Sequence, residues 1–440
     1  MKAKRAEVWS GLGLGVVTFL VYMVGSNRSF GYDAAASFAN FIATPSIWDA
    51  FAVRSVIPTI PLPQVATNDH VLLSLLSHLI YSATGSRSEV VYRVLPALAG
   101  GATVGLSTGV LVRRFGLLAG LCGGLYIATV PLFVDNSRDL RGYSLAALGS
   151  VAGTLLIAGK WTRWRLGAYA LVMGLAIAGQ LFAAVVLLCH LAWILTRRSR
   201  PQLIELAPAW IAAALIGFAA NANIQVTEFV QHGLPAPLFY PTFPRDLALF
   251  LVGAPVLLPV ALWFAVVLLG VWAARRETGL WAAAAVLVLV VGALWLGLKP
   301  AFLYPRFFVF LVPGLAYLMA AAVARWWVLA PIVLVGAATA VVGQAADYTR
   351  DPLALPAAAA AVERIHASGG TACVIHSDEQ ILAAYTTEFT VVTRPDQLAG
   401  CDAVVVVSWG VDLGLRDEAA REFPKLTTLD AYYPAVVLVR

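Results

Sequence analysis

The chain has 440 residues, of which 60% are hydrophobic and only 12% are charged. A soluble domain usually carries about 25% charged residues, so this composition excludes a soluble enzyme and a disordered chain. The net charge of +6 arises largely from Lys and Arg clusters at the ends of apolar runs. That pattern orients membrane helices and does not indicate nucleic-acid binding.

The apolar runs are long enough to cross a hydrocarbon core of about 30 Å and predict a polytopic α-helical membrane protein. The first run, 8–24, follows a basic start and has no convincing cleavage site, so we expect an uncleaved membrane helix. A long polar segment, 25–69, comes next, and the short apolar segment 70–84 follows it. The other predicted spans are 91–112, 116–134, 144–159, 165–178, 180–196, 205–222, 246–274, 279–298, 307–323 and 327–343.

The basic clusters decide how the segment 70–84 is placed. If the N-terminus is cytoplasmic and 70–84 does not cross, every later cluster also lies on the cytoplasmic side. If 70–84 crosses, Arg113 and Arg114 lie outside, and the basic clusters are no longer all on the cytoplasmic side. We therefore expect about 11 transmembrane helices, with 25–69 outside and 70–84 as a juxtamembrane helix.

The tail 347–440 differs from the membrane part, 1–346, because charges return and short β-rich runs appear. These runs are 372–376, 403–408 and 435–439, with helical stretches near 353–367 and 415–422. The pattern predicts a small α/β domain, and the parity of the spans puts it on the extracytoplasmic side.

The tail also contains Cys373 and Cys401, which we expect to be either both reduced or paired with each other. Although His376 follows Cys373 by three residues, no fourth ligand is spaced to complete a tetrahedral zinc site. The other cysteines, Cys122 and Cys189, lie in apolar runs and are most simply core residues.

Polar residues gather at helix mouths on the predicted outer side. The first loop contains Tyr32 and Asp33 and ends at Asn68, Asp69 and His70. A second loop spans 135–143, and a third spans 299–306. A single charge at a membrane edge is often only an anchor, but carboxylates, arginines and an imidazole at three mouths favour a functional site.

The motif Ser-Arg-Asp-Leu-Arg-Gly-Tyr-Ser-Leu at 137–145 resembles the S-Q-E-A-R-P-Y-x-L signature of family 39-like GT-C glycosyltransferases. This family includes protein O-mannosyltransferases and the aminoarabinose transferases of lipid A. Segments 68–79, 93–100 and 305–314 are similar to its N-x-H-P-P-L-Y-Y-L-L-L-H-L, R-L-P-S-A-L-x-G and P-R-Y…P motifs, in the same order. Phe30 to Ala34 stands where the family has an aromatic-x-x-Asp-Glu motif.

The chain departs from the family at two positions. Ala34 replaces the glutamate of the aromatic-x-x-Asp-Glu motif, and Val71 replaces the proline after the histidine. The first change puts a two-carboxylate or metal-assisted site in doubt. We predict no cofactor and no metal ligands, while dependence on a divalent metal is left open.

The resemblance implies a sugar donor linked to polyprenyl phosphate, and the residues fit that chemistry. A phosphate needs cationic partners, and a carboxylate near the anomeric carbon can take a proton from the attacking hydroxyl. Asp33 is the candidate base. The candidate phosphate-binding residues are Arg141, Arg306, His70 and Lys299. The candidate sugar or pocket residues are Tyr32, Asn68, Asp69, Asp139, Tyr143 and Tyr304.

Simpler interpretations stay open for several of these residues. Asp33 could be an ordinary helix N-cap before the alanines that follow, and Asp69 could cap the 70–84 helix. Arg138 and Asp139 could form a surface pair. His78 is best interpreted as a packed interior histidine.

The sequence thus favours an inverting glycosyltransferase at the outer face of the plasma (inner) membrane, and the Ala- and Arg-rich composition suggests a bacterial source. Its expected partners are a polyprenyl-phosphate sugar donor, membrane lipids and a lipid, glycan or protein acceptor, with no nucleic acid. The alternative is a non-catalytic lipid-linked-sugar binding protein or flippase, which Ala34 keeps open. An inverted-repeat transporter is weaker, since we find neither internal symmetry nor mid-span charges.

Overall fold

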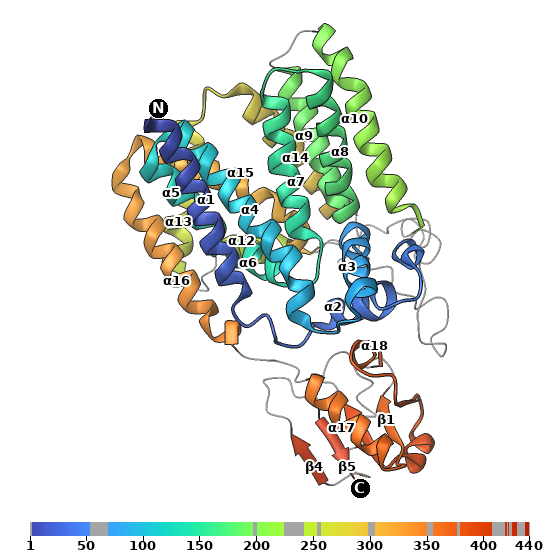
Figure 1. The fold of residues 1–440 in the computed structure, drawn as a ribbon. Coiled ribbons are helices and arrows are strands. Elements are labelled where there is room, and N and C mark those ends of the chain that lie inside the picture. Colours follow the sequence, from blue (N-terminus) through green and yellow to red (C-terminus); the bar gives the residue numbers. More distant parts are fainter. Residues whose placement is uncertain are drawn as a thin grey trace. The chain divides into compact units, whose positions relative to one another are not determined.

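The structure is a computed structural model, and it is mostly helical (Figure 1). Contacts divide the chain into two compact units. The helical unit comprises 1–24, 70–73 and 94–346, and the mixed unit comprises 25–69, 74–93 and 347–440. The residues that the structure describes are 2–52, 69–196, 200–223, 242–252, 257–297, 304–349, 355–375, 379–406, 419, 421, 425–428 and 436–439.

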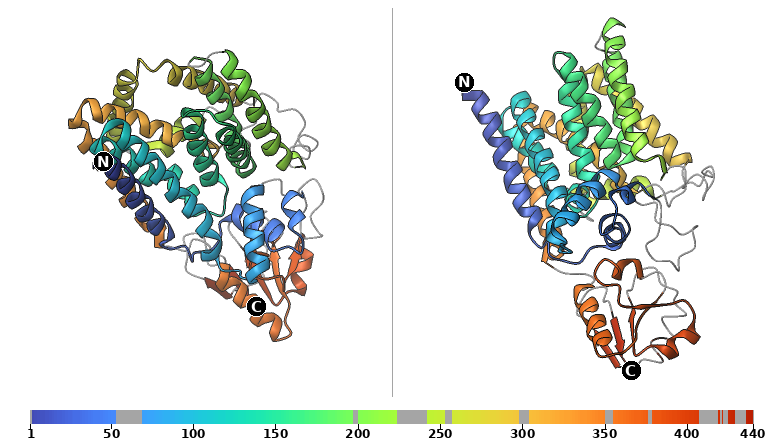
Figure 2. Two further views of the ribbon diagram at one scale, coloured as in Figure 1. Left: turned by 45° about the horizontal axis from the view of Figure 1, so that its top comes forward. Right: turned by 45° about the vertical axis from the view of Figure 1, so that its right-hand side comes forward.

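The helical unit contains two groups of packed helices, because each apolar run satisfies its own backbone hydrogen bonds only as a helix. Figure 2 shows from two further sides that the green helices α8, α9 and α10 run alongside one another. The first group comprises α7 (Tyr143–Ala158), α8 (Arg163–Gly179), α9 (Ala184–Leu195), α10 (Arg200–Ala220) and α14 (Thr278–Gly297). The second group comprises α1 (Lys2–Met23), α4 (Glu89–Phe115), α5 (Leu117–Thr129), α13 (Leu257–Ala273) and α15 (Val312–Arg325). The unit also contains α6 (Pro131–Arg138), α12 (Phe243–Val252) and most of α16 (Ala330–Thr349).

Helices α1 and α4 pack against each other in antiparallel directions through glycines. A Cβ atom on Gly11 would lie 2.6 Å from the Gly105 carbonyl oxygen, and one on Gly15 would lie 2.8 Å from that of Gly101. Helix α3 (Val71–Thr84) has 14 residues and is therefore only about 21 Å long, too short to span. The juxtamembrane placement of 70–84 stays a prediction.

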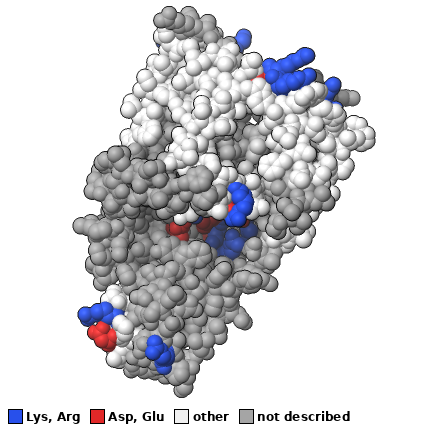
Figure 3. Space-filling model, turned by 180° about the vertical axis from the view of Figure 1, so that it is seen from behind, with Lys and Arg blue, Asp and Glu red and all other residues white. Residues whose placement is uncertain are grey.

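Basic side chains gather at the upper edge of the helical unit in Figure 3. At the ends of α1 and α4, Arg113 lies 4.0 Å from Glu7, and Arg114 forms a 3.1 Å ion pair with Glu277. A hollow of about 450 Å³ beside them is lined by residues that include Phe115, Arg275, Arg276 and Arg325. These clusters share one end of the unit, as the positive-inside argument requires.

The helices divide the predicted spans differently at two places. Among the described residues, five helices are long and apolar enough to cross a membrane, or six if α5 and α6 count as one broken span. The predicted run 116–134 bends by 56° between these two helices, where Val130 is extended before Pro131. The predicted run 246–274 contains two helices, α12 and α13, instead of one. The total of 11 spans stays a prediction.

The break predicted at Gly179-Gln180 is confirmed. Helix α8 ends at Gly179, and a 3-10 turn, η4 (Leu181–Ala183), precedes α9. The Gln180 side chain caps this turn by accepting a 3.1 Å hydrogen bond from the Ala183 backbone N–H. The break therefore has a local cause in the polar side chain that follows the glycine.

The mixed unit contains a five-stranded sheet in the order β2-β1-β3-β5-β4. Strands β1, β2 and β3 are parallel, whereas β5 runs antiparallel to β3 and β4. Every residue of β1 and β3 is buried, which is typical of central strands covered on both faces. The strands are β1 (Ala372–Ile375), β2 (Thr390–Val392), β3 (Ala403–Val406), β4 (Lys425–Thr428) and β5 (Val436–Val439).

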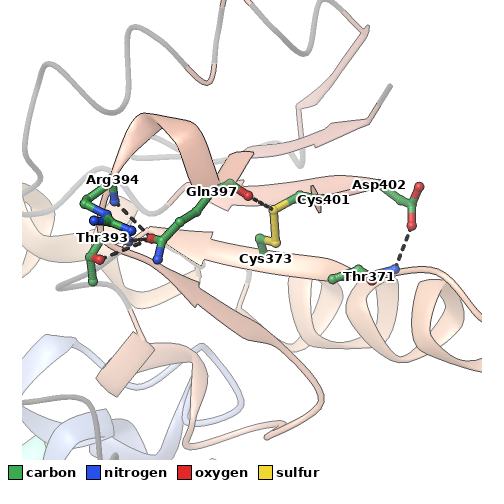
Figure 4. Close-up of a disulfide and its surroundings, with 7 residues drawn as sticks. All are labelled: Thr371, Cys373, Thr393, Arg394, Gln397, Cys401 and Asp402. Atoms are coloured by element: carbon green, nitrogen blue, oxygen red, sulfur yellow. Dashed lines mark hydrogen bonds between the residues drawn. A yellow bond between two sulfur atoms is a disulfide. The ribbon is translucent and has the colours of Figure 1, made fainter. Parts of the chain in front are cut away.

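Cys373 and Cys401 form a disulfide that joins β1 to the residues just before β3 (Figure 4). Beside it, the Asp402 carboxylate accepts a 2.8 Å hydrogen bond from the Thr371 N–H. Of the two states that the sequence left open, the structure therefore contains the paired one.

Helices from both ends of the chain complete the mixed unit. From the first outer loop come α2 (Tyr32–Ser37), a π-helical turn η1 (Phe38–Ile42) and a 3-10 turn η2 (Ile47–Phe51). From the tail come α17 (Leu355–Ala367), α18 (Glu379–Leu382) and the 3-10 turn η8 (Pro395–Gly400). Helix α18 packs against α2, although more than 300 residues separate them in sequence (Figure 1).

Candidate functional site

The turn between α6 and α7 places Arg141 inside the helical unit. The Arg141 backbone N–H donates to the Asp139 carbonyl at 2.8 Å, which tightens the turn. The Arg141 side chain is fully buried, and its guanidinium carbon lies 5.9 Å from the centre of the Tyr143 ring. A buried guanidinium in an apolar bundle is costly, so it marks a candidate site for an anionic ligand.

Gly142 allows this turn to meet the end of α8. A Cβ atom on Gly142 would lie 2.1 Å from the Gly179 carbonyl oxygen and 3.1 Å from Nδ1 of His70. Nδ1 of His70 lies 2.7 Å from the same carbonyl, which can only accept, so Nδ1 carries the proton. The His70 ring also meets the Tyr143 ring edge to face, with 4.7 Å between the centres.

Arg306 reaches the same region from η6 (Pro305–Leu311), a 3-10 segment that begins with proline. This segment packs against α6, α7, α12, α15 and η4, so it lies where the two helix groups meet. The Arg306 guanidinium carbon lies 4.8 Å from the Tyr304 ring centre. The next residue, Phe307, stacks on Phe182 at 4.8 Å.

The electrostatics of His70 show that these groups share one site. Burial lowers the pKa of His70 well below its usual 6.5, and the positive charges of Arg141 and Arg306 lower it further. The hydrogen bond to Gly179 opposes this shift. At neutral pH the imidazole is therefore uncharged. His70 carries no positive charge in this state, and the positive charge that the described residues bring to this site comes from Arg141 and Arg306.

The structure thus brings together three of the four predicted phosphate-binding residues, with Tyr143 and Tyr304 beside them. Lys299 and Asn68 lie outside the described residues.

Arg138 has a structural role that the sequence did not reveal. Its side chain is 3% exposed and donates to the carbonyl oxygens of Tyr22 and Val24 at the end of α1. An arginine at this position satisfies carbonyls that the helix leaves without partners and complements the helix dipole. The interpretation of Arg138 as a surface residue is therefore wrong. Asp139 is half-buried, and its Oδ1 accepts from the Leu140 N–H at 2.9 Å.

In the mixed unit, Asp33 lies in the first turn of α2 and is half-buried. Gly31 occupies the N-cap position, so the interpretation of Asp33 as the N-cap is wrong. Tyr32 begins the helix, but its side chain is outside the described part. Ala34, at the position of the family glutamate, is fully buried.

Two further polar residues of the mixed unit have local partners. Asp69 accepts a hydrogen bond from the Ser74 hydroxyl on the first turn of α3, which is compatible with both a capping and a pocket role. His78 is buried, with Nδ1 3.0 Å from the Ile42 carbonyl oxygen and Nε2 3.1 Å from the Ser82 hydroxyl. His78 is a packed interior histidine, as the sequence indicated.

Comparison with solved structures explains the arrangement. The chain is similar to ArnT from Cupriavidus metallidurans in the apo state, with a TM-score of 0.58, 14% identity, and coverage of 96% of this chain and 97% of that one. For ArnT bound to undecaprenyl phosphate the TM-score is 0.61, again at 14% identity, with 97% of each chain covered. The chain has the GT-C fold.

A second GT-C protein supports the same fold. The Archaeoglobus fulgidus oligosaccharyltransferase in complex with Zn and sulfate has a TM-score of 0.56 and 15% identity, over 92% of this chain and 69% of that one. No protein-family model and no curated protein sequence matches the chain. The likeness is therefore one of fold, carried by structure rather than by sequence.

Sequence reasoning missed several residues that build this candidate site. Gly142 and Gly179 permit the contact that holds His70, and Phe182 and Phe307 form an aromatic wall beside it. The signal for the glycines was present, since one lies inside the Arg141 motif and the other at the predicted helix break. Nothing local indicated that they meet.

The described residues of this chain contain no group of three or more His, Cys, Asp or Glu side chains that could hold a metal ion. Dependence on a divalent cation stays a question for experiment.

Proposed function

We propose that this protein is an inverting glycosyltransferase that moves a sugar from a polyprenyl-phosphate donor to a hydroxyl acceptor. The observation that carries the proposal is the convergence of Arg141 and Arg306 on one buried, neutral histidine. ArnT, with the same fold, has been solved with undecaprenyl phosphate, which supports a donor of this class.

The proposed location is the outer face of a bacterial plasma membrane, with the acceptor a lipid, a glycan or a protein. The Cys373–Cys401 disulfide supports an oxidising compartment for the mixed unit, because such bonds persist outside the cytoplasm. The basic clusters gathered at one end of the helical unit support a cytoplasmic position for that end.

In this proposal the arginines bind the donor phosphate. A guanidinium presents parallel N–H groups that match two phosphate oxygens, and a buried site strengthens each charge-assisted hydrogen bond. His70 donates its Nδ1 proton to the Gly179 carbonyl oxygen and stays neutral between the arginines. Tyr143 and Tyr304 form part of the pocket wall around the arginines.

Asp33 is the proposed base. Its carboxylate takes the proton of the acceptor hydroxyl while the hydroxyl oxygen forms a bond to the anomeric carbon. The bond between that carbon and the phosphate oxygen breaks in the same step, and its electron pair leaves with the polyprenyl phosphate. One displacement inverts the anomeric configuration, and the leaving phosphate is already anionic, so no general acid is needed.

The test uses the purified full chain in lipid nanodiscs with a panel of polyprenyl-phosphate sugars and acceptors. Release of polyprenyl phosphate and donor affinity are measured separately. Asp33→Asn should lower single-turnover transfer by about 10²- to 10⁴-fold while donor affinity changes little. No transfer with any donor in the panel would count heavily against the proposal.

Arg141→Ala and Arg306→Ala should weaken donor binding by roughly 10- to 150-fold, the equivalent of about 1.5–3 kcal/mol for a lost charge-assisted hydrogen bond. Lysine at either position should restore binding only partly, since an ammonium lacks the bidentate fork. Arg113→Ala is the matched control, because its side chain is 77% exposed at the other end of the unit. Equal loss of affinity in the control would remove the phosphate-binding roles.

The alternative is a non-catalytic lipid-linked-sugar binding protein or flippase. The observation that favours it is Ala34, buried at the position where the family carries a second carboxylate. Such a protein binds the donor without turnover, and Asp33→Asn leaves its binding unchanged. Donor binding by the wild-type chain together with undetectable transfer would select this alternative.

A further inference from the structure

The segment Ser26–Phe30, which leads into α2, is held by a buried polar cluster of the mixed unit. This cluster consists of Glu89 and Arg93 on α4 together with Tyr385, which follows α18. Glu89 and Arg93 are only 8% and 3% exposed. We call these three residues the loop brace.

Arg93 holds the backbone of the segment through its guanidinium. Nη1 donates to the carbonyl oxygens of Ser26, at 2.7 Å, and Arg28, while Nη2 donates to that of Ser29 at 2.8 Å. The guanidinium carbon also lies 5.5 Å from the centre of the Phe30 ring. Three carbonyl groups in a non-helical stretch thereby gain a charged partner.

Tyr385 completes the brace from the C-terminal part of the chain. Its hydroxyl oxygen accepts a 2.7 Å hydrogen bond from the Phe30 N–H, and the hydroxyl donates to the Glu89 carboxylate. Burial and the nearby Glu89 charge raise the pKa of Tyr385, so the hydroxyl keeps its proton. Two neighbouring contacts tie the same parts together. The Ser29 hydroxyl accepts from the Leu355 N–H at 2.9 Å, and Arg87 donates to the Ala384 carbonyl at 3.0 Å.

The braced segment is directly continuous with α2. Gly31 is the N-cap, and its carbonyl accepts from the Ala35 N–H at 2.9 Å, so the orientation of the first turn follows that of Phe30. The Phe30 ring packs on Phe38, which begins the next helical turn, at 5.3 Å. In sequence, Asp33 lies between Phe30 and Phe38, three residues after Phe30, whose N–H bonds to Tyr385.

We propose that Tyr385 is a positioning residue that orients α2 and thereby the Asp33 carboxylate, so that the tail 347–440 takes part in catalysis through the loop brace. The proposal rests on the role of Asp33 in the proposed function. Tyr385 acts through the peptide N–H of Phe30, three residues before Asp33. The sheet of the tail then serves as the rigid support from which this contact is made.

The test compares Tyr385→Phe with Tyr92→Phe in the full chain. Tyr92 is a matched control, because its ring also packs against Phe30, at 6.4 Å, but its hydroxyl donates to the Ser86 carbonyl instead of the loop. Phenylalanine at 385 keeps the ring contact and removes only the hydroxyl. Hydrogen exchange of peptides covering 29–37 reports on the brace without requiring activity.

In Tyr385→Phe, exchange of these amides should accelerate by about tenfold or more, since a buried N–H loses its acceptor. Single-turnover transfer should fall by about 10- to 100-fold at saturating donor, while donor affinity stays within about twofold of wild type. Tyr92→Phe should match wild type in both measurements. If the two tyrosine hydroxyls contributed only to stability, both variants would lose thermal stability and the transfer rate of the folded enzyme would be unchanged.

Wild-type exchange at 29–37 in Tyr385→Phe would overturn the brace, and wild-type turnover despite faster exchange would overturn its catalytic role. An equal loss of turnover in Tyr92→Phe would also overturn that role. Asp33→Asn is assayed in parallel. Full activity of Asp33→Asn shows that the proposed base is wrong and removes the catalytic part of the inference, whereas the exchange data still decide whether Tyr385 holds the loop.

Discussion

Replacing Gly142 with alanine tests whether the contact between the Arg141 turn and the end of α8 builds the donor site. The added Cβ would lie 2.1 Å from the Gly179 carbonyl oxygen, whereas an ordinary contact is at least about 3.2 Å. Backbone on one side must therefore shift by roughly 1 Å. Either Gly179 moves away from His70, or the turn that carries Arg141 and Tyr143 moves.

Overpacking of this kind typically destabilises a protein by about 1–3 kcal/mol. A displacement of about 1 Å at a site can cost about 10²-fold in activity, so Gly142→Ala should lose donor affinity and turnover together. Gly167→Ala, in the second turn of α8, is the matched control, because nothing lies within 4 Å of its added Cβ. Donor affinity by calorimetry and thermal unfolding in nanodiscs are measured for both. Wild-type affinity and stability in Gly142→Ala would refute this account of the turn.

Three further outcomes follow from the described geometry. The folded state keeps His70 neutral, whereas in the unfolded chain His70 binds a proton below its usual pKa of 6.5. The stability of the folded state should therefore fall as the pH drops from 6.5. Thermal unfolding at pH 7.5 and 5.0 should show a smaller loss of stability in His70→Gln than in wild type. Replacing Cys373 and Cys401 with serine opens a loop whose ends are 28 residues apart. From the chain entropy of such a loop, the sheet should lose about 3–4 kcal/mol of stability. Limited proteolysis of the tail with and without reductant would check this. A membrane-impermeant maleimide applied to intact cells should label Ala367→Cys and not Arg276→Cys. The native cysteines should give little background labelling, because they are disulfide-bonded or lie within the helices. The opposite labelling pattern would reverse the topology.

Local signals in the sequence determined most of the helices. Apolar runs of membrane length have no other way to satisfy their backbones, so α1, α4, α7 and α14 lie close to where the runs predict them. The interruption after Gly179 and the sidedness of the basic clusters were also local properties. Both could be predicted from the order of charges and helix breaks along the chain.

Part of the candidate site was equally accessible. Arg141, Arg306 and His70 were selected because charge at a helix mouth is rare and matches an ordered set of motifs. Their convergence in the helical unit agrees with that reasoning. The charge state of His70 was not accessible, since it depends on burial and on two guanidiniums far away in sequence.

Tertiary structure alone decided the roles of the residues whose partners are distant. The sequence left open whether Arg138 forms a surface pair or has a functional role, but its side chain lies buried against the end of α1, more than 110 residues earlier. Nothing in the tail suggested that Tyr385 hydrogen-bonds to Phe30, 355 residues away, and the sequence left open whether Cys373 pairs with Cys401 or stays reduced. A helix forms from contacts within a few residues and leaves its mark on periodicity and composition. A brace, a close glycine contact or a shifted pKa depends on which distant atoms the fold brings within a few ångströms, and the sequence specifies that only through the packing of the whole unit.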